Sequence, residues 1–119
     1  MIRKIYTIKI SVLTIVHPLT GDKIQVANED FSNCMTWNNA IEACEKLGKG
    51  WRLPSIDELK IMYNELHKKE QCLFSHVYSY WSSTEHHIDG VAWSFGFDDG
   101  EACFYPKVEK KKVRALRTL

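Results

Sequence analysis

The stretch of sequence that decides the fold is GWRLPSIDEL, at residues 50–59. Ser55 stands three residues before Glu58, and this spacing forms a capping box, in which each side chain bonds the backbone of the other at the start of a helix. Apolar residues then recur at helical spacing: Leu59, Met62, Tyr63 and Leu66. Because Lys68 and Lys69 suit the negative end of a helix dipole, the sequence predicts a helix that begins after Ser55 and ends near them.

A second amphipathic segment precedes this stretch, from Met35 to about Leu47. Its apolar side chains fall on one helical face: Trp37, Ala40, Ile41, Cys44 and Leu47. Thr36 can cap the first turn, and Gly48 and Gly50 can adopt the left-handed conformation that ends a helix. The sequence therefore predicts two helices joined by the GWRLP segment.

Period-two alternation of apolar and polar residues predicts strands on both sides of the helices. The expected strands cover residues 5–16, 23–27, 78–84, 91–97 and 102–105, with a last extended segment at 113–117. Strands, two helices and then an antiparallel meander make an α+β fold. A chain of 119 residues is too short for a second core, so we expect one domain over residues 1–119.

The segment 91–97 has an uneven distribution of side-chain size. Large apolar groups alternate with small ones: Val91, Trp93, Phe95 and Phe97 on one face, and Ala92, Ser94 and Gly96 on the other. Asp98, Asp99 and Gly100 follow as a hairpin turn, with Gly100 at positive φ. In the returning strand we expect Ala102 and Phe104 to face inward and Cys103 outward.

Bulk composition excludes several classes of function. Lys and Arg total 16 against 15 for Asp and Glu, a net charge of +1, so nothing draws the whole chain to nucleic acid or an anionic membrane. No stretch approaches the ~20 apolar residues of a membrane span. The basic start Met1–Lys4 resembles a signal peptide, but Lys9 interrupts the apolar run, and we expect a strand there.

The cysteines are Cys34, Cys44, Cys72 and Cys103. They form no C-x-x-C pair, and we expect four free, mostly buried thiols. Reduced thiols favour synthesis in the cytoplasm. Whether the protein then joins a virion is left open.

Several motifs in one order resemble a known family. They are MTW at 35–37, GWRLP at 50–54, YWSST at 80–84, the pair Ala92-Trp93, and VRALR at 113–117. The chain resembles, over about residues 26–117, the Lcl C-terminal domain family, small bacterial and phage modules related to the C-type-lectin fold. The resemblance implies two helices packed on a twisted antiparallel sheet with paired N- and C-terminal strands. It implies no reaction, since related modules recognise glycans, proteins or polymers, often within adhesins or virion proteins.

Two departures from related proteins bear on function. Relatives often carry a cysteine in the last strand that could bridge to the first helix, whereas Ala115 stands here opposite Cys44. Calcium-dependent lectins use a Trp-Asn-Asp strand, whereas this chain has Trp-Ser-Ser at residues 81–83. Hydroxyls are poor substitutes for carboxylates around calcium, so calcium-dependent sugar binding is not expected.

Other chemistry-bearing residues have structural interpretations that we favour. Arg52 is expected to bond turn carbonyls or a nearby carboxylate, and Ser82 and Ser83 to bond backbone groups. We expect no metal ion, cofactor or catalytic residue, because His86-His87 lies on a loop without a ligand motif and no nucleophile stands beside a base. The basic residues at 107–117 are expected to form a charged hairpin that guards a sheet edge.

The expected interaction surface is the loop 75–90 together with the hairpin 98–101, because loops on a rigid scaffold carry recognition and aromatic groups anchor it. Its candidate ligand-binding residues are Tyr78, Tyr80, His86, His87, Trp93, Asp98 and Asp99. The leading hypothesis is a non-enzymatic module that binds a cell-surface glycan or polymer without calcium. The alternative is a structural subunit of a phage virion or surface fibre, acting through protein contacts and homo-oligomer or virion assembly. Neither hypothesis involves nucleic acid or a membrane.

Overall fold

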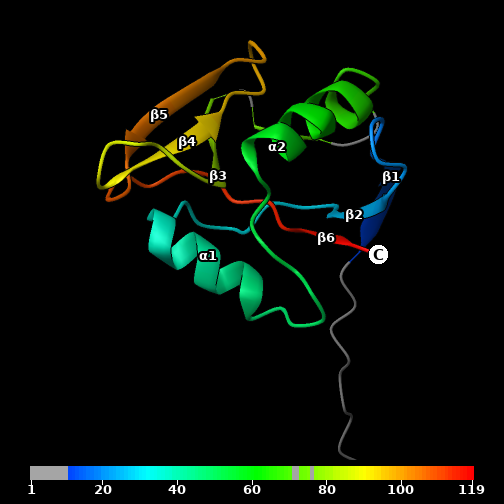
Figure 1. Cartoon of the computed structure of the whole chain (residues 1–119), viewed down its shortest axis with the longest axis horizontal. Coiled ribbons are helices and arrows are strands. Elements are labelled where there is room, and N and C mark those ends of the chain that lie inside the picture. Colours follow the sequence, from blue (N-terminus) through cyan, green and yellow to red (C-terminus); the bar gives the residue numbers. More distant parts are fainter. Residues whose placement is uncertain (1–10, 71–72, 76) are drawn as a thin grey trace, which may run out of the picture.

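The computed structural model describes residues 11–70, 73–75 and 77–119. These residues form six strands, two α-helices and one π-helical turn, and Figure 1 labels the strands and the α-helices. In chain order they are β1 (Val12–Val16), β2 (Lys23–Ala27), α1 (Trp37–Glu45), α2 (Ile56–Met62), the π-helical turn η1 (Tyr63–His67), β3 (Tyr80–Glu85), β4 (Val91–Phe95), β5 (Ala102–Pro106) and β6 (Leu116–Thr118). This order confirms the predicted α+β class.

The strands form two antiparallel sheets of three strands each. The first has the order β1-β2-β6, so the C-terminal strand pairs with the N-terminal hairpin through β2. The second has the order β3-β4-β5. The single sheet that the sequence predicted is therefore divided in two, and β6 lies beside β2 rather than β1. Residues 5–10 of the predicted first strand lie outside the described residues.

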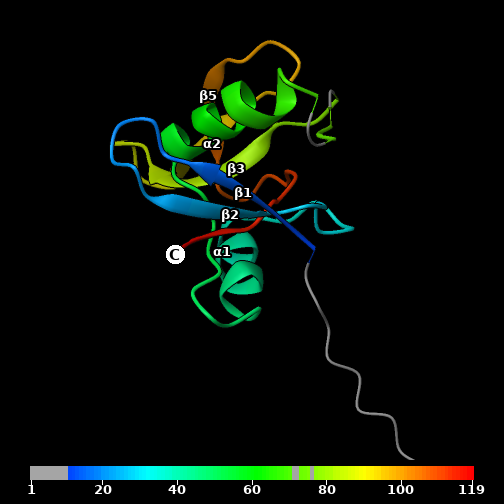
Figure 2. The same cartoon turned by 90° about the vertical axis from the view of Figure 1, so that its right-hand side faces the viewer.

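The first sheet lies in the middle of the molecule. Figure 2 shows α1 below it, and α2 with the second sheet above it. Two apolar clusters fill these two spaces. The upper one contains Ile15, Ile24, Val26, Leu59, Met62, Leu66, Phe74, Tyr80, Phe95, Phe97 and Leu116. The lower one contains Ala27, Trp37, Ala40, Cys44, Trp51, Leu53, Trp81, Ala92, Val113 and Ala115.

The start of α2 is the predicted capping box. The Glu58 backbone N–H donates to the Ser55 hydroxyl at 3.2 Å, and the Ser55 N–H donates to Glu58 Oε1 at 2.8 Å. Arg52 donates two further hydrogen bonds to the same carboxylate, at 2.6 and 2.7 Å. Burial alone would raise the pKa of Glu58, but the bonds from Arg52 and Ser55 outweigh it and hold that pKa below its ordinary value. The prediction that Arg52 bonds a nearby carboxylate is confirmed.

The start of α1 is capped less completely. Thr36 occupies the predicted cap position with extended backbone angles, but within the described part of the chain its side chain makes no capping hydrogen bond. Trp37 compensates with a buried hydrogen bond of 2.8 Å from its indole N–H to the Ser82 carbonyl. The helix is thus fixed to β3 by a side chain rather than by its cap.

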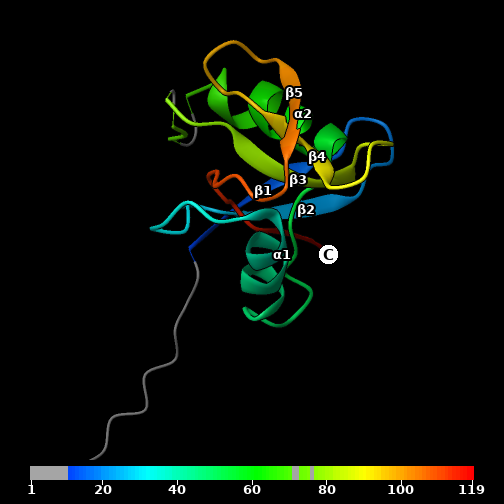
Figure 3. The same ribbon diagram turned by 90° about the vertical axis from the view of Figure 1, so that its left-hand side faces the viewer.

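The segment 107–117, here called the C-terminal run, joins the separate parts of the fold. Its backbone bonds segments far apart in sequence: Ala27 N to Ala115 O (3.0 Å), Phe31 N to Val113 O (3.0 Å), Met35 N to Lys111 O (2.9 Å), Arg52 N to Leu116 O (2.8 Å) and Trp81 N to Lys112 O (3.0 Å). Figure 3 shows the run, in orange and red, passing between the second sheet and β2. The run therefore connects both sheets and both clusters.

The C-terminal run is not the charged hairpin guarding a sheet edge that the sequence predicted. Lys111 and Arg114 are buried. Five of its cations lie over aromatic rings: Lys107 over Trp37 (4.1 Å to the ring centroid), Lys111 over Tyr105 (3.4 Å), Lys112 over Tyr78 (5.9 Å), Arg114 over Phe74 (4.3 Å) and Arg117 over Trp51 (4.8 Å). The ring quadrupole attracts a cation over its face, so the positive charge of this segment serves packing.

Candidate functional site

The two faces of the second sheet carry different side chains. In the β4–β5 ladder Trp93 pairs with Phe104, and Ser94 pairs with Cys103. Paired residues of an antiparallel ladder point to the same face, so one face presents Trp93 and Phe104. The other, here called the small-residue face, presents Ser94 and Cys103, with Tyr105 opposite Ala92. The alternation predicted for residues 91–97 follows from this register, and each face forms a different surface.

The first surface is a group of rings, here called the aromatic platform, in which His86 and Trp93 are half-buried and His87 and Phe104 are exposed. Trp93 and Phe104 meet edge to face, with ring centroids 5.2 Å apart. The His86 ring lies 4.3 Å from the Phe104 ring and 5.2 Å from the Trp93 ring, and His87 lies 4.1 Å from His86. Phe104 remains 49% exposed. A large apolar ring left half in water on a strand is a candidate contact surface.

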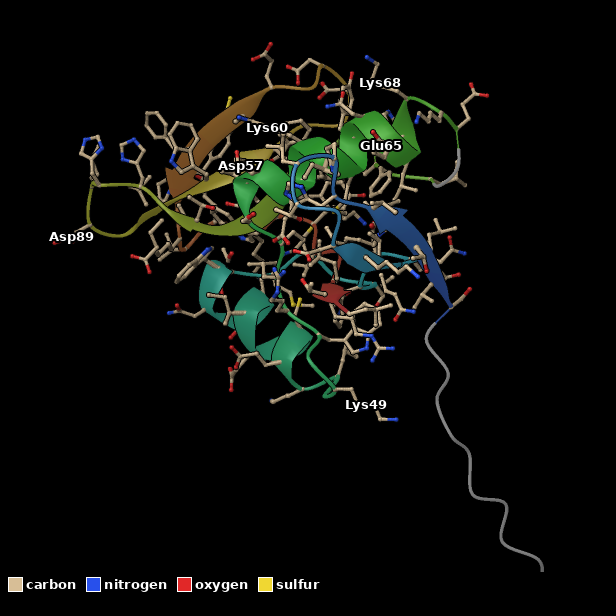
Figure 4. The ribbon with its side chains drawn as sticks, turned by 45° about the vertical axis from the view of Figure 1, so that its right-hand side comes forward. Lys49, Asp57, Lys60, Glu65, Lys68 and Asp89 are labelled. Atoms are coloured by element: carbon tan, nitrogen blue, oxygen red, sulfur yellow. The ribbon has the colours of Figure 1, made fainter. Side chains whose placement is uncertain are left out.

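The loop that carries the two histidines is fixed by hydrogen bonds. The His86 N–H donates to the Val91 carbonyl at 3.0 Å, and the Ile88 N–H donates to His86 Nδ1 at 3.2 Å. The Lys107 N–H donates to the Gly90 carbonyl at 2.8 Å, which ties the loop to the end of β5. Figure 4 labels Asp89 at the outer tip of this loop. Desolvation by the neighbouring rings and the charge of His87 lower the pKa of His86, which favours its neutral ring.

The second surface is an open hollow on the small-residue face, with a volume of about 270 Å³. Its lining includes Tyr78, Ser94, Gly96, Asp98, Asp99 and Lys111. A side chain at Gly96 would lie 2.7 Å from Asp98 Oδ1 and 3.0 Å from Asp99 Oδ1. The two carboxylates therefore occupy the space that a larger residue at position 96, directly after β4, would fill.

The structure divides the candidate residues between these two surfaces and the core. His86, His87 and Trp93 belong to the aromatic platform, and Tyr78, Asp98 and Asp99 line the hollow. Tyr80 belongs to neither, because it is fully buried. Its hydroxyl donates to Asp30 Oδ2 at 2.7 Å and accepts from the Ser75 N–H at 2.7 Å, so Tyr80 is part of the scaffold.

Sequence reasoning missed one residue on each surface. Phe104 was expected to face inward, but it lies opposite Trp93 and half exposed. The observed register is centred between Asp98 and Asp99, whereas the predicted three-residue turn at 98–100 would have paired Trp93 with Tyr105. Lys111 was assigned to a charged hairpin at a sheet edge, and no local pattern could have placed it in the hollow, because the hollow also has lining residues from β4 and β5.

The described residues contain no group of three or more His, Cys, Asp and Glu side chains that could hold a metal ion. Cys34, Cys44 and Cys103 are free thiols, whereas Cys72 lies outside the described residues. Burial, with a smaller effect from the charge of Glu45, raises the pKa of the Cys44 thiol to about 12, so this thiol stays protonated. No described helix is long and apolar enough to cross a membrane.

Comparison with known families agrees with these features. The model of the Lcl C-terminal domain matches residues 18–117, nearly the whole chain. The chain belongs to the Lcl C-terminal domain family. Among solved structures, the crystal structure of botrocetin, a C-type-lectin-like protein, is similar with a TM-score of 0.57. The match covers 81% of this chain and 91% of the botrocetin chain at 13% sequence identity, which shows a shared fold. No curated protein matches the chain.

In this Lcl C-terminal domain the motifs that carry the family resemblance are largely structural. Arg52 of GWRLP holds the α2 cap, and Trp81 of YWSST is buried with its indole N–H on the Met35 carbonyl at 2.9 Å. Arg114 of VRALR is buried on Asp30 at 2.7 Å. The predicted interpretation of Ser82 is also confirmed, since its hydroxyl donates to the Trp93 carbonyl at 2.6 Å. Most of the exposed platform and the hollow lie outside these motifs.

Proposed function

We propose that this domain is a non-enzymatic recognition module that binds a cell-surface glycan or similar polymer without calcium, on the aromatic platform. The observation that carries the proposal is the group of rings at His86, Trp93 and Phe104, which contact one another with centroids 4.3–5.2 Å apart while Phe104 stays half exposed. The fold supports a binding module in general terms, and the platform supplies a specific surface for it.

The chemistry of the platform suits a sugar ring. A pyranose has an apolar face of C–H groups and an edge of hydroxyls, and it matches a surface that combines apolar rings with a few polar atoms. Trp93 and Phe104 supply the apolar area. His86 Nδ1 accepts from Ile88 N–H, which leaves Nε2 as the ring nitrogen for a hydroxyl. The loop hydrogen bonds hold these groups in place before binding, which lowers the entropic cost of association.

Independence from calcium is supported by the chain at residues 81–83. Calcium takes six to eight oxygen ligands, most effectively carboxylates. Here Ser82 is fully buried and its hydroxyl is bonded to the Trp93 carbonyl. Ser82 stands where the Trp-Asn-Asp strand has Asn, and it serves here to connect β3 to β4, while Ser83 stands where that strand has its carboxylate.

The proposal is tested by binding of labelled protein to a glycan and bacterial-surface array, with and without EDTA. We expect saturable binding that survives EDTA. Phe104→Ala should weaken this binding by about tenfold or more, as expected for an aromatic anchor. Leu19→Ala is the matched control, because it removes an apolar side chain that is 90% exposed on the β1–β2 turn, away from the platform.

Three results would contradict the proposal. Equal binding by wild type and Phe104→Ala would move the site away from the platform. Loss of binding in EDTA would reject calcium independence. Failure of every surface to retain the wild-type protein would favour the structural subunit of a larger assembly, which light scattering would reveal as concentration-dependent association.

A further inference from the structure

The hollow on the other face of the second sheet contains a buried lysine in a fixed position. The Lys111 backbone exchanges two hydrogen bonds of 2.9 Å with Met35, and the next residue, Lys112, is bonded to Ser79 and Trp81. The side chain of Lys111 crosses the Tyr105 ring, with Nζ 3.4 Å from the ring centroid. The residue is only 9% exposed, and it lines the hollow. Its ammonium group is therefore presented from a rigid floor.

This ammonium group has an incomplete set of partners. Its carboxylate neighbour is Glu109, whose Oε1 lies 3.9 Å from Nζ, beyond hydrogen-bond distance. Within the described residues, Nζ donates no hydrogen bond to any side chain or carbonyl. Burial lowers the pKa of Lys111, and the charges of Glu109, Cys103 and Cys34 oppose this shift only in part. A buried cation with three donors is stabilised by an anion that accepts them.

The opposite charge lies on another wall of the same hollow. The Oδ1 atoms of Asp98 and Asp99 both lie within 3.0 Å of the point where a Gly96 side chain would begin. Asp99 Oδ1 accepts one hydrogen bond, from the Glu101 N–H at 3.0 Å, so the turn holds this carboxylate in place. One cation and at least two carboxylates therefore line the same open hollow.

We propose that the hollow binds a small zwitterionic molecule, whose carboxylate pairs with Lys111 and whose ammonium group pairs with Asp98 and Asp99. A simple anion would be attracted by Lys111 but repelled by the two carboxylates. A simple cation would be attracted by the carboxylates but repelled by Lys111. A ligand with both charges satisfies both walls, and Tyr78 and Tyr105 also line the hollow. The volume of about 270 Å³ suits a small molecule.

This site is separate from the aromatic platform, because Ser94 and Cys103 face it whereas Trp93 and Phe104 face the other side of the sheet. The inference therefore does not depend on the proposed glycan binding. It adds a second site to the domain, with a different ligand chemistry.

The test is titration of the full chain, followed by ¹H–¹⁵N NMR, with the ω-amino acids glycine, β-alanine, 4-aminobutyrate and 6-aminohexanoate. We expect one chain length to bind best, because the walls are fixed, with shifts at the backbone amides of Ser94, Gly96 and Lys111. Butyrate and butylammonium, which each carry only one of the two charges, should bind at least tenfold more weakly than the best zwitterion.

Variants assign the two ends of the ligand. Lys111→Met should abolish the preference for the zwitterion over butylammonium, and Asp98→Asn with Asp99→Asn should abolish its preference over butyrate. Lys110→Met and Asp57→Asn are matched controls, since each removes the same charge from an exposed position elsewhere. The proposal is overturned if none of the amino acids shifts these amide signals when it is added at 20-fold molar excess over the protein or more. It is also overturned if Lys111→Met retains wild-type selectivity.

Discussion

Aromatic rings meet different neighbours in two regions of this domain. Beneath the C-terminal run, Trp37, Trp51 and Phe74 are each covered by a Lys or Arg cation at 4.1–4.8 Å from the ring centroid. On the aromatic platform, Trp93 and Phe104 meet each other and two histidines, and Phe104 stays half exposed. A ring under a cation is already desolvated and has its face occupied, whereas an open ring retains a face for a ligand.

This difference distinguishes aromatic residues of the scaffold from aromatic residues of the proposed binding surface, although both regions have a similar composition. Both regions are aromatic and both contain side chains that carry or can gain positive charge, so residue type alone does not distinguish them. What differs is whether the tertiary fold has brought a cation over the ring. Changes in the covered region should therefore affect stability, and changes on the platform should affect binding.

The largest expected effect is at Arg114, the cation over Phe74. It is 2% exposed and donates to Asp30 Oδ1 at 2.7 Å and to the Ala27 carbonyl at 3.1 Å. Arg114→Met leaves Asp30 without its cation, and we expect the free energy of unfolding to fall by about 3–5 kcal/mol in urea denaturation. Adding Asp30→Asn should restore part of this loss. A fall below 1 kcal/mol would show that covered rings do not define the scaffold.

A smaller effect is expected at Glu58, which receives the Arg52 fork at 2.6 and 2.7 Å. Glu58→Ala should lower the free energy of unfolding by about 1–2 kcal/mol, because the charged hydrogen bonds and the helix cap are lost. The loss stays moderate because the Arg52 side chain is 41% exposed, and water screens its charge. The measurement is again urea denaturation, now as a function of pH.

The pH dependence at Glu58 has a definite sign. Its pKa is lowered in the folded state, so its contribution is complete above the unfolded value of about 4.3 and is lost as pH falls through the folded value. Glu58→Gln should therefore be less sensitive to acid than wild type below pH 4.3. Parallel acid curves for the two proteins would contradict the role assigned to the Arg52 fork.

On the platform we expect Phe104→Ala to change the free energy of unfolding by no more than about 1 kcal/mol, since half of the ring is already in water. The same change should remove most glycan binding. A loss of stability as large as that of Arg114→Met would place Phe104 in the scaffold and remove the contrast between the two regions.

The smallest effect is expected at Lys111, the cation over Tyr105 that lines the hollow. Burial lowers its pKa, so its charge destabilises the folded state below that pKa, and the cost disappears as pH rises past the ordinary lysine value of about 10.4. Lys111→Met should match or exceed wild-type stability at pH 7, and the difference should narrow by pH 11. A clear loss of stability at pH 7 would assign Lys111 to the scaffold instead of the hollow.

Much of the fold could be predicted because its signals are local. The capping box at Ser55 and Glu58 involves residues three apart, and the confirmed turn at Gly100, with φ of 72°, depends on a single glycine. The division into two sheets could not be predicted, because strand order depends on the C-terminal run crossing between β2 and β3. No periodicity within a strand specifies which other strand lies beside it.

The candidate surfaces were predictable only in part, for the same reason. His86, His87 and Trp93 were chosen as aromatic groups near a loop, and the platform contains all three. Tyr80 met the same criteria but is buried, because Asp30 and Ser75 enclose its hydroxyl. Whether a tyrosine in a strand faces water is decided by such long-range partners, which a single sequence does not reveal.

The C-terminal run also determines when the domain can fold. Its hydrogen bonds reach back to Ala27, Met35 and Arg52, and Leu116 and Val113 complete the upper and lower clusters respectively. Each of these contacts closes a long loop, and such loops slow folding. On the ribosome, neither cluster can close before this run leaves the exit tunnel. We therefore expect the domain to fold cooperatively and only after the C-terminal run has been synthesised. Until then its aromatic residues stay exposed to chaperones.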